Sequence, residues 1–579
     1  MPLSEMSLPS LRLPPLVLSL AVFGAGPLMA DGVAGPYLAG RVASIQSDYE
    51  AAATYFTQSL LADPANSGIQ TNTLLAELGL GDFDKAEGIA RALGDEGGKN
   101  GLADLAILAT LAKKGDFAAV LAEMDKGRSA GPLVDGFFRG WAQLGTGQMS
   151  EAAGEFDALA KKREVASFAL FHKALALASV GDFEGADAIL SGKASGPINA
   201  TRRSVIAHAQ ILSQLERNTD AVELITKIMG TAPADPVVAA LLADLSAGKT
   251  VPFDLIRTPT DGVAEVFLAV SSALANEVQP GDTATSVDVL MFGRTAQYLR
   301  PDLSDASLMV AGTLEAQGQH DLAIAAYGQI PADSPDHLEA ELGRADALIA
   351  SDRMDAAIEV LQQLAKTTPE RVQAWAALGD TLRRTERFTE AVTAYDKALA
   401  LVPAPQPQHW ALYYARAICH ERLKDWTKAE GDFRTALKLS PDQPQVLNYL
   451  GCSYLEMNQN LDEALSMIDR AAKAQPDNGA IADSLGWAFY RLGRYPEAEA
   501  EMERAIELEP VDPVVNDHLG DVYWAVGRKR EAEFQWKRAL SFKPEEDEAE
   551  RIRRKLEVGL DVVLKEEGAA PLSVTTNGG

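Results

Sequence analysis

Apolar residues recur at one fixed set of spacings in segment after segment of this chain. In one segment these positions are Trp375, Leu378, Gly379, Leu382, Ala391, Tyr395, Ala398 and Pro403. The segments that begin at Ala482 and Asn516 repeat this spacing and begin 34 residues apart. Apolar positions three or four residues apart share one face of an α-helix. Each segment is therefore predicted to form two helices joined by a short turn.

The spacing resembles that of the tetratricopeptide repeat (TPR), whose W-x-x-L-G-x-x-Y…A-x-x-x-F…P pattern recurs about every 34 residues. The resemblance implies an all-α fold, in which antiparallel helix pairs stack into a right-handed superhelical solenoid. A single pair cannot bury its apolar face alone, so neighbouring pairs cover each other. The resemblance also implies a protein that binds partners along an extended surface and is not an enzyme.

The repeats differ in quality along the chain. Residues 304–546 hold seven regular units, whereas residues 33–235 hold degenerate units in which the Leu-Gly and Trp landmarks are mostly missing. The tripeptide Gly-Asp-Phe recurs there at Gly81, Gly115 and Gly181. Glycine is typical of a helix end in the left-handed conformation, and aspartate is typical of the N-terminus of the next helix. The tripeptide therefore predicts the turn within a helix pair.

Residues 236–303 break the register of the repeats. Helical spacing of apolar residues continues at Val237–Leu245, Val263–Ala275 and Val287–Leu299. An extended loop is predicted near residues 252–260, and a long loop within a repeat array is either functional or a hinge. We interpret the whole region as an irregular helical linker or degenerate unit between two halves of the solenoid.

Two short regions follow the last repeat. Residues 547–565 carry apolar positions at helical spacing among many charges, which predicts a capping helix that covers the exposed end of the solenoid. Residues 566–579 are predicted to be a disordered tail.

The N-terminus has the pattern of a secretory signal peptide. Residues 13–28 are apolar apart from Ser19, and small residues follow up to Ala30. A run of this length with such an ending predicts export to the periplasm and cleavage after Ala30. Arg12 is the only basic residue before the run and Glu5 offsets it, so an uncleaved membrane anchor and a cytoplasmic location stay open as alternatives.

The net charge limits the classes of partner that the chain can bind, and the cysteines indicate whether it can form a disulfide. The formal net charge of −29 excludes nucleic acid and anionic lipid surfaces as natural partners, because both would repel the chain. It favours a protein or peptide partner that is basic, although an acidic surface also serves solubility. The two cysteines, Cys419 and Cys452, are predicted to lie on first helices of adjacent repeats, too far apart for a disulfide. No catalytic, metal-binding or cofactor-binding motif occurs, so no cofactor is expected.

The candidate binding site follows from the resemblance. In TPR proteins the first helix of each repeat lines the concave groove, and the side chains between its packing positions face the ligand. Mapped onto this sequence, that face holds Arg383, Arg384, Tyr414, Arg422, Asn448, Asp483, Trp487, Tyr490, Arg491, Asp517, Asp521 and Trp524. Aromatic and arginine side chains dominate binding hot spots, although several of these residues could instead pack on the next helix.

The same positions bear on the class of partner. TPR modules that bind the acidic C-termini of cytosolic chaperones have lysine and asparagine where this chain has Asp380 and other aspartates, which argues against that ligand. The sequence resembles bacterial envelope TPR proteins, and the resemblance implies a non-enzymatic scaffold or adaptor in envelope assembly or secretion. The alternatives are a cytoplasmic or membrane-tethered assembly factor, and a regulatory or recruiting subunit of an envelope protease or polysaccharide synthase.

Overall fold

The computed structural model describes residues 33–95, 100–194, 196, 198–233, 235–279, 282–569 and 572. Over these residues the regular structure is helical, with 31 α-helices, one short 3₁₀ helix and no strand. The all-α class expected from the sequence is confirmed. The predicted signal peptide and most of the predicted disordered tail lie outside the described residues.

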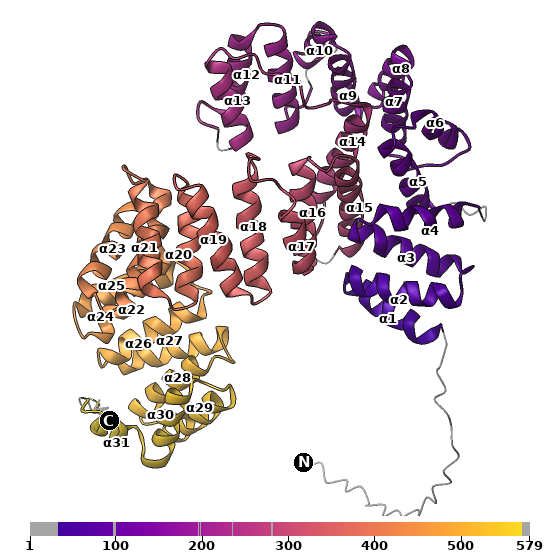
Figure 1. Cartoon of the computed structure of the whole chain (residues 1–579). Coiled ribbons are helices and arrows are strands. Elements are labelled where there is room, and N and C mark those ends of the chain that lie inside the picture. The colour runs from indigo at the N-terminus through magenta and orange to yellow at the C-terminus, as the bar shows by residue number, and fades with distance from the viewer. Residues whose placement is uncertain are drawn as a thin grey trace, which may run out of the picture. The chain divides into compact units, whose positions relative to one another are not determined.

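The helices form two compact units, and the boundary between Leu322 and Ala323 falls inside α17 (His320–Tyr327). Unit 1 begins with six helix pairs, in which each helix packs on the next one along the chain (Figure 1). The first helices of these pairs are α1 (Ala34–Ile45), α3 (Ser67–Leu80), α5 (Gly101–Lys113), α7 (Asp135–Gly145), α9 (Ala166–Ser179) and α11 (Arg202–Gln214). The second helices are α2 (Tyr49–Ala62), α4 (Phe83–Asp95), α6 (Phe117–Asp125), α8 (Met149–Ala160), α10 (Phe183–Leu190) and α12 (Asn218–Met229).

Unit 1 continues through the region in which the sequence loses the repeat register. Its remaining helices are α13 (Pro236–Ser246), α14 (Pro259–Ala275), α15 (Thr283–Leu299) and α16 (Ser304–Ala316). The three helices that the apolar spacing predicts in residues 236–303 correspond to α13, α14 and α15. The last two are 17 residues long, and they pack on each other (Figure 1).

Unit 2 holds the regular repeats, again with each helix packed on the next. Its first helices are α18 (His337–Ala350), α20 (Val372–Arg384), α22 (Trp410–Arg422), α24 (Pro444–Glu456), α26 (Gly479–Arg491) and α28 (Pro513–Ala525). Its second helices are α19 (Met354–Thr367), α21 (Phe388–Ala400), α23 (Trp426–Leu439), α25 (Leu461–Ala474), α27 (Tyr495–Leu508) and α29 (Lys529–Ser541). The 3₁₀ helix η1 (Pro407–His409) precedes α22, and α30 (Glu546–Val558) and α31 (Leu560–Glu566) complete the unit.

The Leu-Gly landmark has a packing reason. A Cβ atom added at Gly379 would lie 2.7 Å from the ring of Tyr395, and one at Gly520 would lie 2.4 Å from the ring of Trp536. Both rings belong to second helices and are fully buried. Glycine therefore lets a large aromatic ring of the second helix contact the backbone of the first helix.

The Gly-Asp-Phe tripeptide forms the turn that the sequence predicts. Gly81 and Gly115 have φ angles of 81° and 74°, which is the left-handed region that favours glycine. The carboxylate of Asp116 accepts a hydrogen bond from the Ala119 backbone N–H at 3.0 Å, which caps α6. The prediction of a glycine stop followed by an aspartate cap is confirmed.

Candidate functional site

The first helices of unit 1 are covered by the chain itself. Helix α14 packs on α5, α7 and α9, and α15 packs on α3 and α5. Eight of the 13 residues of α5 are buried, and only Gly101 and Lys113 at its two ends are exposed. The face that lines the groove in the TPR family is therefore core on α5.

Specific contacts fix α14 and α15 against these helices. A Cβ atom at Gly262 of α14 would lie 2.2 Å from the ring of Trp141 on α7, so the two helices touch closely. Arg294 of α15 is buried, and its Nε–H donates to the Gly79 carbonyl of α3 at 3.0 Å. The hydroxyl of Thr260 donates to the Ala112 carbonyl of α5 at 2.9 Å.

The segment that joins α13 to α14 is also part of the core of unit 1. Leu255 and Ile256 are buried, and the side-chain amide of Gln214 donates to the Val251 carbonyl at 2.6 Å. Residues 236–303, which we interpreted as an irregular helical linker or degenerate unit, are helices and a connecting segment that pack within unit 1. The register is lost because these helices fill an inner face instead of extending the stack.

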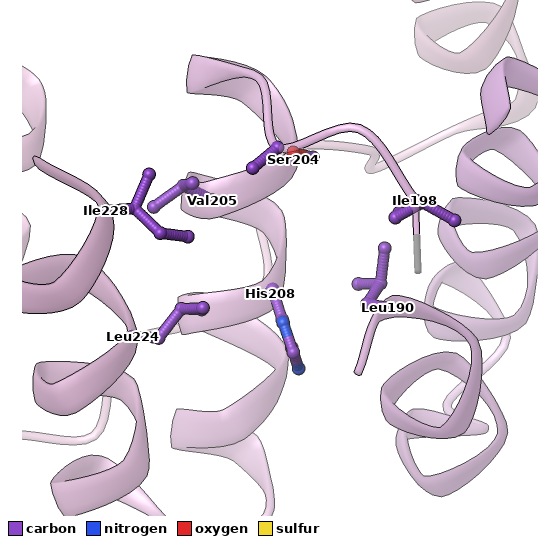
Figure 2. A pocket seen from close by; sticks show the side chains of 8 residues that line it. Leu190, Ile198, Ser204, Val205, His208, Leu224 and Ile228 are labelled. Carbon is purple, nitrogen blue, oxygen red and sulfur yellow. The ribbon is translucent and has the colours of Figure 1, made fainter. Parts of the chain in front are cut away.

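The hollow in Figure 2 lies beside α11 and α12 and is lined mainly by apolar residues. It holds about 50 Å³ of free space. His208 lines it and pairs through Nε2 with a carboxylate oxygen of Asp187 at 2.8 Å. Ser204 lies one turn before His208, but its hydroxyl caps α11 by accepting from the Thr201 N–H at 2.8 Å. These contacts assign the three polar side chains to capping and ion pairing within unit 1.

The C-terminal end of unit 2 is closed by α30. Lys555 is fully buried, and its Nζ lies 2.6 Å from Asp521 and 2.7 Å from Asp517, both on α28. Arg551 adds a second cation 3.6 Å from Asp521. Burial raises the pKa of Asp521, and Lys555 opposes that rise. The carboxylates of α28 are therefore neutralised by the chain itself.

Three of the predicted groove residues are buried, which corrects their assignment as ligand contacts. Asp521 is held by Lys555 and also accepts a hydrogen bond from the indole N–H of Trp536 at 2.9 Å. Asp483 pairs with His518 Nδ1 at 3.0 Å. Tyr490 stacks on Trp487 with ring centroids 4.7 Å apart. Asp483 and Asp521 therefore meet partners inside the chain, and the Tyr490 ring packs on Trp487 of the same helix.

The pairing of Asp483 with His518 changes the titration of the imidazole. Burial lowers the pKa of His518, but the Asp483 carboxylate outweighs that effect and the net pKa is raised. The same imidazole stacks on Trp487 with ring centroids 4.0 Å apart. Trp487 is therefore engaged by Tyr490 and His518, although it stays half-buried.

Two further predicted residues, Asp517 and Trp524, also lie at the closed end. Asp517 pairs with Lys555, as described above. The indole N–H of Trp524 donates to Asp561 at 3.0 Å, and a Cβ atom at Gly559 would lie 2.7 Å from the indole ring. The chain's own C-terminal helices α30 and α31 thus occupy the place that we assigned to a partner.

Four first helices of unit 2 keep an open stripe of exposed and half-buried residues. From α20 to α26 this stripe consists of Gln373, Ala377, Asp380 and Arg384; Ala411, Tyr414, Ile418 and Arg422; Gln445, Asn448, Cys452 and Glu456; and Ala480, Ser484, Trp487 and Arg491. On every helix the first and last of the four are exposed and the middle two are half-buried. The remaining predicted residue, Arg383, is half-buried beside Asp380.

Contacts between neighbouring helices hold the half-buried residues of the stripe in place. The Asn448 side-chain amide donates to the Ser484 hydroxyl at 3.2 Å, and Tyr449 donates to Glu421 at 3.1 Å. Burial raises the pKa of the Cys452 thiol to about 11, so it is protonated at neutral pH. The Asn448 carbonyl oxygen is buried without a hydrogen-bond partner in the described part of the chain.

The sequence also contains a signal for the closed end of unit 2 and a signal for the covered helices of unit 1, which the repeat pattern alone does not reveal. Arg551 and Lys555 follow Asp517 and Asp521 by 34 residues each, so α30 continues the repeat register with cations opposite the acids of α28. In unit 1, the stretch that forms α5 is apolar on all sides, which is typical of a helix that is buried all round.

Comparison with known proteins agrees with this geometry. A model of the tetratricopeptide repeat family matches residues 37–100, 311–372, 342–406, 376–444 and 450–513. The chain contains tetratricopeptide repeats. The matches cover much of the regular half and the first repeats of unit 1.

Among curated proteins, the TPR repeat-containing protein PA4667 of Pseudomonas aeruginosa is 36% identical over 93 residues, 16% of this chain and 16% of that protein. The E3 ubiquitin-protein ligase CHIP of Arabidopsis thaliana is 37% identical over 112 residues, 19% of this chain and 38% of that protein. The match therefore spans well under two thirds of either relative.

Among solved structures, the Cut9–Hcn1 hetero-tetramer of the APC/C is 15% identical, with 92% of this chain and 97% of that chain covered and a TM-score of 0.37. A tetratricopeptide repeat protein from Parabacteroides merdae is 15% identical, with coverages of 44% and 98% and a TM-score of 0.37. YrrB, described as a TPR protein with an unusual peptide-binding site, is 18% identical, with coverages of 34% and 99% and a TM-score of 0.28.

The described residues contain neither a candidate metal site nor a membrane-spanning helix. No group of three or more His, Cys, Asp and Glu side chains in them could hold a metal ion. Within the same ranges, no helix is both long and apolar enough to cross a membrane.

Proposed function

We propose that this chain is a non-catalytic scaffold that binds an extended segment of a partner protein across the open stripe of α20, α22, α24 and α26. One observation carries the proposal: these four helices keep exposed residues at matching positions, whereas α28 and the first helices α3 to α9 of unit 1 are covered by other parts of the chain. An accessible, rigid stripe of this kind suits a peptide ligand, because its half-buried side chains are already ordered before the peptide binds.

The chemistry of the stripe changes the class of partner that we expect. The net charge of −29 favours a basic partner, and the sequence predicts that Asp483, Asp517 and Asp521 supply the acidic face. Asp517 and Asp521 are paired with Lys555 and Asp483 with the His518 imidazole, whereas Arg384 and Arg422 are exposed. A basic partner would therefore have to bind away from the stripe.

A photoreactive amino acid at position 480 tests the site. Ala480 lies exposed on the stripe, and Ala500 is an equally exposed alanine on α27, the second helix of the same repeat. In cells that make the protein, we expect covalent adducts with another polypeptide from position 480 and none from position 500. Equal adducts at both positions, or adducts at neither, would refute binding in the stripe.

We further propose that the protein acts in the bacterial cell envelope after export. The support is the apolar run of residues 13–28 and the small residues up to Ala30. Mass spectrometry of the protein from fractionated cells should find a chain that begins at Asp31 in the periplasm. A chain that still begins at Met1 and stays in the cytosolic fraction would instead support a cytoplasmic assembly factor.

A further inference from the structure

The open stripe holds three exposed arginines that form no ion pair with another helix; Arg530 and Arg538 of α29 form none either. Acidic residues outnumber basic ones by 82 to 53, so most arginines meet a carboxylate of the chain. Arg416, for example, lies 2.7 Å from Asp432. Within the described residues, Arg384 and Arg491 have no carboxylate within 4.0 Å, and Arg422 has only its chain neighbour Glu421, at 3.7 Å. Three exposed guanidinium groups thus lack a close carboxylate on another helix, although Arg384 acts on Asp346 of α18 and opposes the rise of its pKa.

These arginines share one register. Arg384, Arg422, Glu456 and Arg491 are the last residues of α20, α22, α24 and α26, and we call them the arginine row. The row follows the stack, so neighbouring members lie on neighbouring first helices. Within it, partial burial and the nearby Glu421 carboxylate raise the pKa of Glu456, and Arg422 and Arg491 oppose that rise.

A structural role of the arginines accounts for part of this pattern. A cation in the last turn of a helix interacts favourably with the partial negative charge of that helix end. The same benefit would remain if each arginine were also paired with a carboxylate, as Lys473 in the last turn of α25 is with Asp469. The helix-end effect therefore does not explain why exposed arginines in one row lack close partners.

We propose, on the basis of the function proposed above, that the bound segment is acidic and carries three carboxylates that pair with Arg384, Arg422 and Arg491. Arginine binds a carboxylate through two parallel N–H donors, which gives orientation as well as affinity. Glu456 repels a fourth carboxylate at its own step of the row. A basic segment would meet repulsion at three steps of the four.

The spacing of the carboxylates follows from the geometry of the stack. Packed helices lie about 8–10 Å apart, and an extended chain rises about 3.3 Å per residue, so one step of the row corresponds to about three residues. Arg384 and Arg422 are one step apart, and Arg422 and Arg491 are two steps apart because α24 lies between them. The segment should therefore carry acids at one position, about three residues later, and about six residues after that.

A short acidic segment suits this chain better than a long polyanion. The row is the cationic part of the open stripe, whereas the chain as a whole carries −29. A nucleic acid would extend past the row and meet the repulsion of the remaining acidic surface. A segment of about ten residues would contact the row alone.

A pair of labelled peptides tests the pattern. The first is Asp-Ser-Thr-Asp-Ser-Thr-Gln-Ser-Thr-Asp with a fluorescent label, and the second has lysine at the three aspartate positions. A third peptide has the composition of the first with its three aspartates adjacent. Fluorescence anisotropy at low ionic strength measures the affinity of the full-length chain for each. We expect the spaced acidic peptide to bind more tightly than the other two.

Charge reversal in the protein tests the same ion pairs from the other side of the interface. With exposed pairs contributing about 0.2–1 kcal/mol each, the R384E/R422E/R491E variant should lose about tenfold in affinity for the acidic peptide and gain preference for the lysine peptide. The control variant R530E/K537E/R553E has the same net charge and changes exposed residues of α29 and α30. It should keep the wild-type preference, and melting followed by circular dichroism should show that both variants are folded.

The outcomes separate this inference from the function on which it rests. Equal binding of the acidic peptide by wild type and R384E/R422E/R491E, or a wild-type preference for the lysine peptide, would overturn the acidic partner. If adducts from position 480 persist in that variant, the stripe still binds a segment and only its proposed chemistry is wrong. If position 480 gives no adducts in wild type, both proposals fail.

Discussion

Replacing Lys555 with methionine should unfold the end of unit 2 without unfolding the remaining repeats. The ammonium group is fully buried between Asp517 and Asp521, 2.7 Å and 2.6 Å away. Methionine keeps most of the side-chain volume but leaves two carboxylates without their closest cation. Breaking a buried ion pair in this way costs about 3–5 kcal/mol. Arg551 stays 3.6 Å from Asp521, so we expect the lower end of that range.

The loss should be local, because repeats contact only their neighbours. Hydrogen exchange should show faster opening of α28, α30 and α31, with α20 and α22 unchanged. The matched control is Lys537→Met on α29, whose side chain is 65% exposed and which should cost little. Adding Asp521→Asn to Lys555→Met should recover part of the lost stability, because it removes the carboxylate left unpaired.

The pH dependence of the stability loss in Lys555→Met independently checks whether the unpaired carboxylate of Asp521 causes that loss. Burial raises the pKa of Asp521, and the loss of Lys555 should raise it further. An acid with a raised folded-state pKa destabilises the fold above that pKa, and the penalty vanishes below its unfolded value of about 3.9. The defect of Lys555→Met should therefore shrink as the pH falls from 8 towards the unfolded value of about 3.9. A cost below about 1 kcal/mol at pH 8, or opening that spreads evenly over unit 2, would refute a buried pair that holds the cap.

Two other features of the structure yield expected outcomes. Gly262→Ala should destabilise unit 1 by about 1–3 kcal/mol in urea unfolding, because its Cβ meets the Trp141 ring. The control Gly312→Ala on α16 adds a Cβ with no atom within 4 Å and should not destabilise the unit. Equal effects of the two substitutions would contradict the packing of α14 on α7. The raised pKa of His518 predicts a contribution to stability that is complete below its unfolded value of about 6.5 and is lost as the pH rises through the folded value. Asp483→Asn should remove this difference between the melting temperatures at pH 5.5 and pH 8.5, and a difference that survives the substitution would assign it to other groups.

The sequence predicted the repeats well because their pattern depends on local contacts. The glycine in Leu378-Gly379 marks a close helix approach, and Gly81-Asp82-Phe83 marks a turn; each is formed by residues near in the chain. The stripe was predicted in part for the same reason. Arg384, Tyr414, Arg422, Asn448, Trp487 and Arg491 lie on it as the repeat register implies.

The errors concern residues whose surroundings come from distant parts of the chain. Asp521 has the spacing of a groove residue, yet Lys555 buries it from the next helix in the stack. The residues around Gly262 lack the repeat register, which we interpreted as an irregular linker or degenerate unit, and they pack on a helix more than 100 residues earlier in the sequence, which the spacing did not predict. Spacing along one helix tells which face a residue occupies, but not what covers that face.

The sequence alone determined the helical class, the helix pairs and the turns of this protein, because each depends on side chains within one repeat or its neighbour. The tertiary structure decided which inner faces are open: α14 and α15 fill those of α3 to α9, α30 closes α28, and α20 to α26 keep theirs. That difference depends on where whole helices dock, and docking is set by the fit of apolar surfaces and by the pairing of buried charges far apart in the chain.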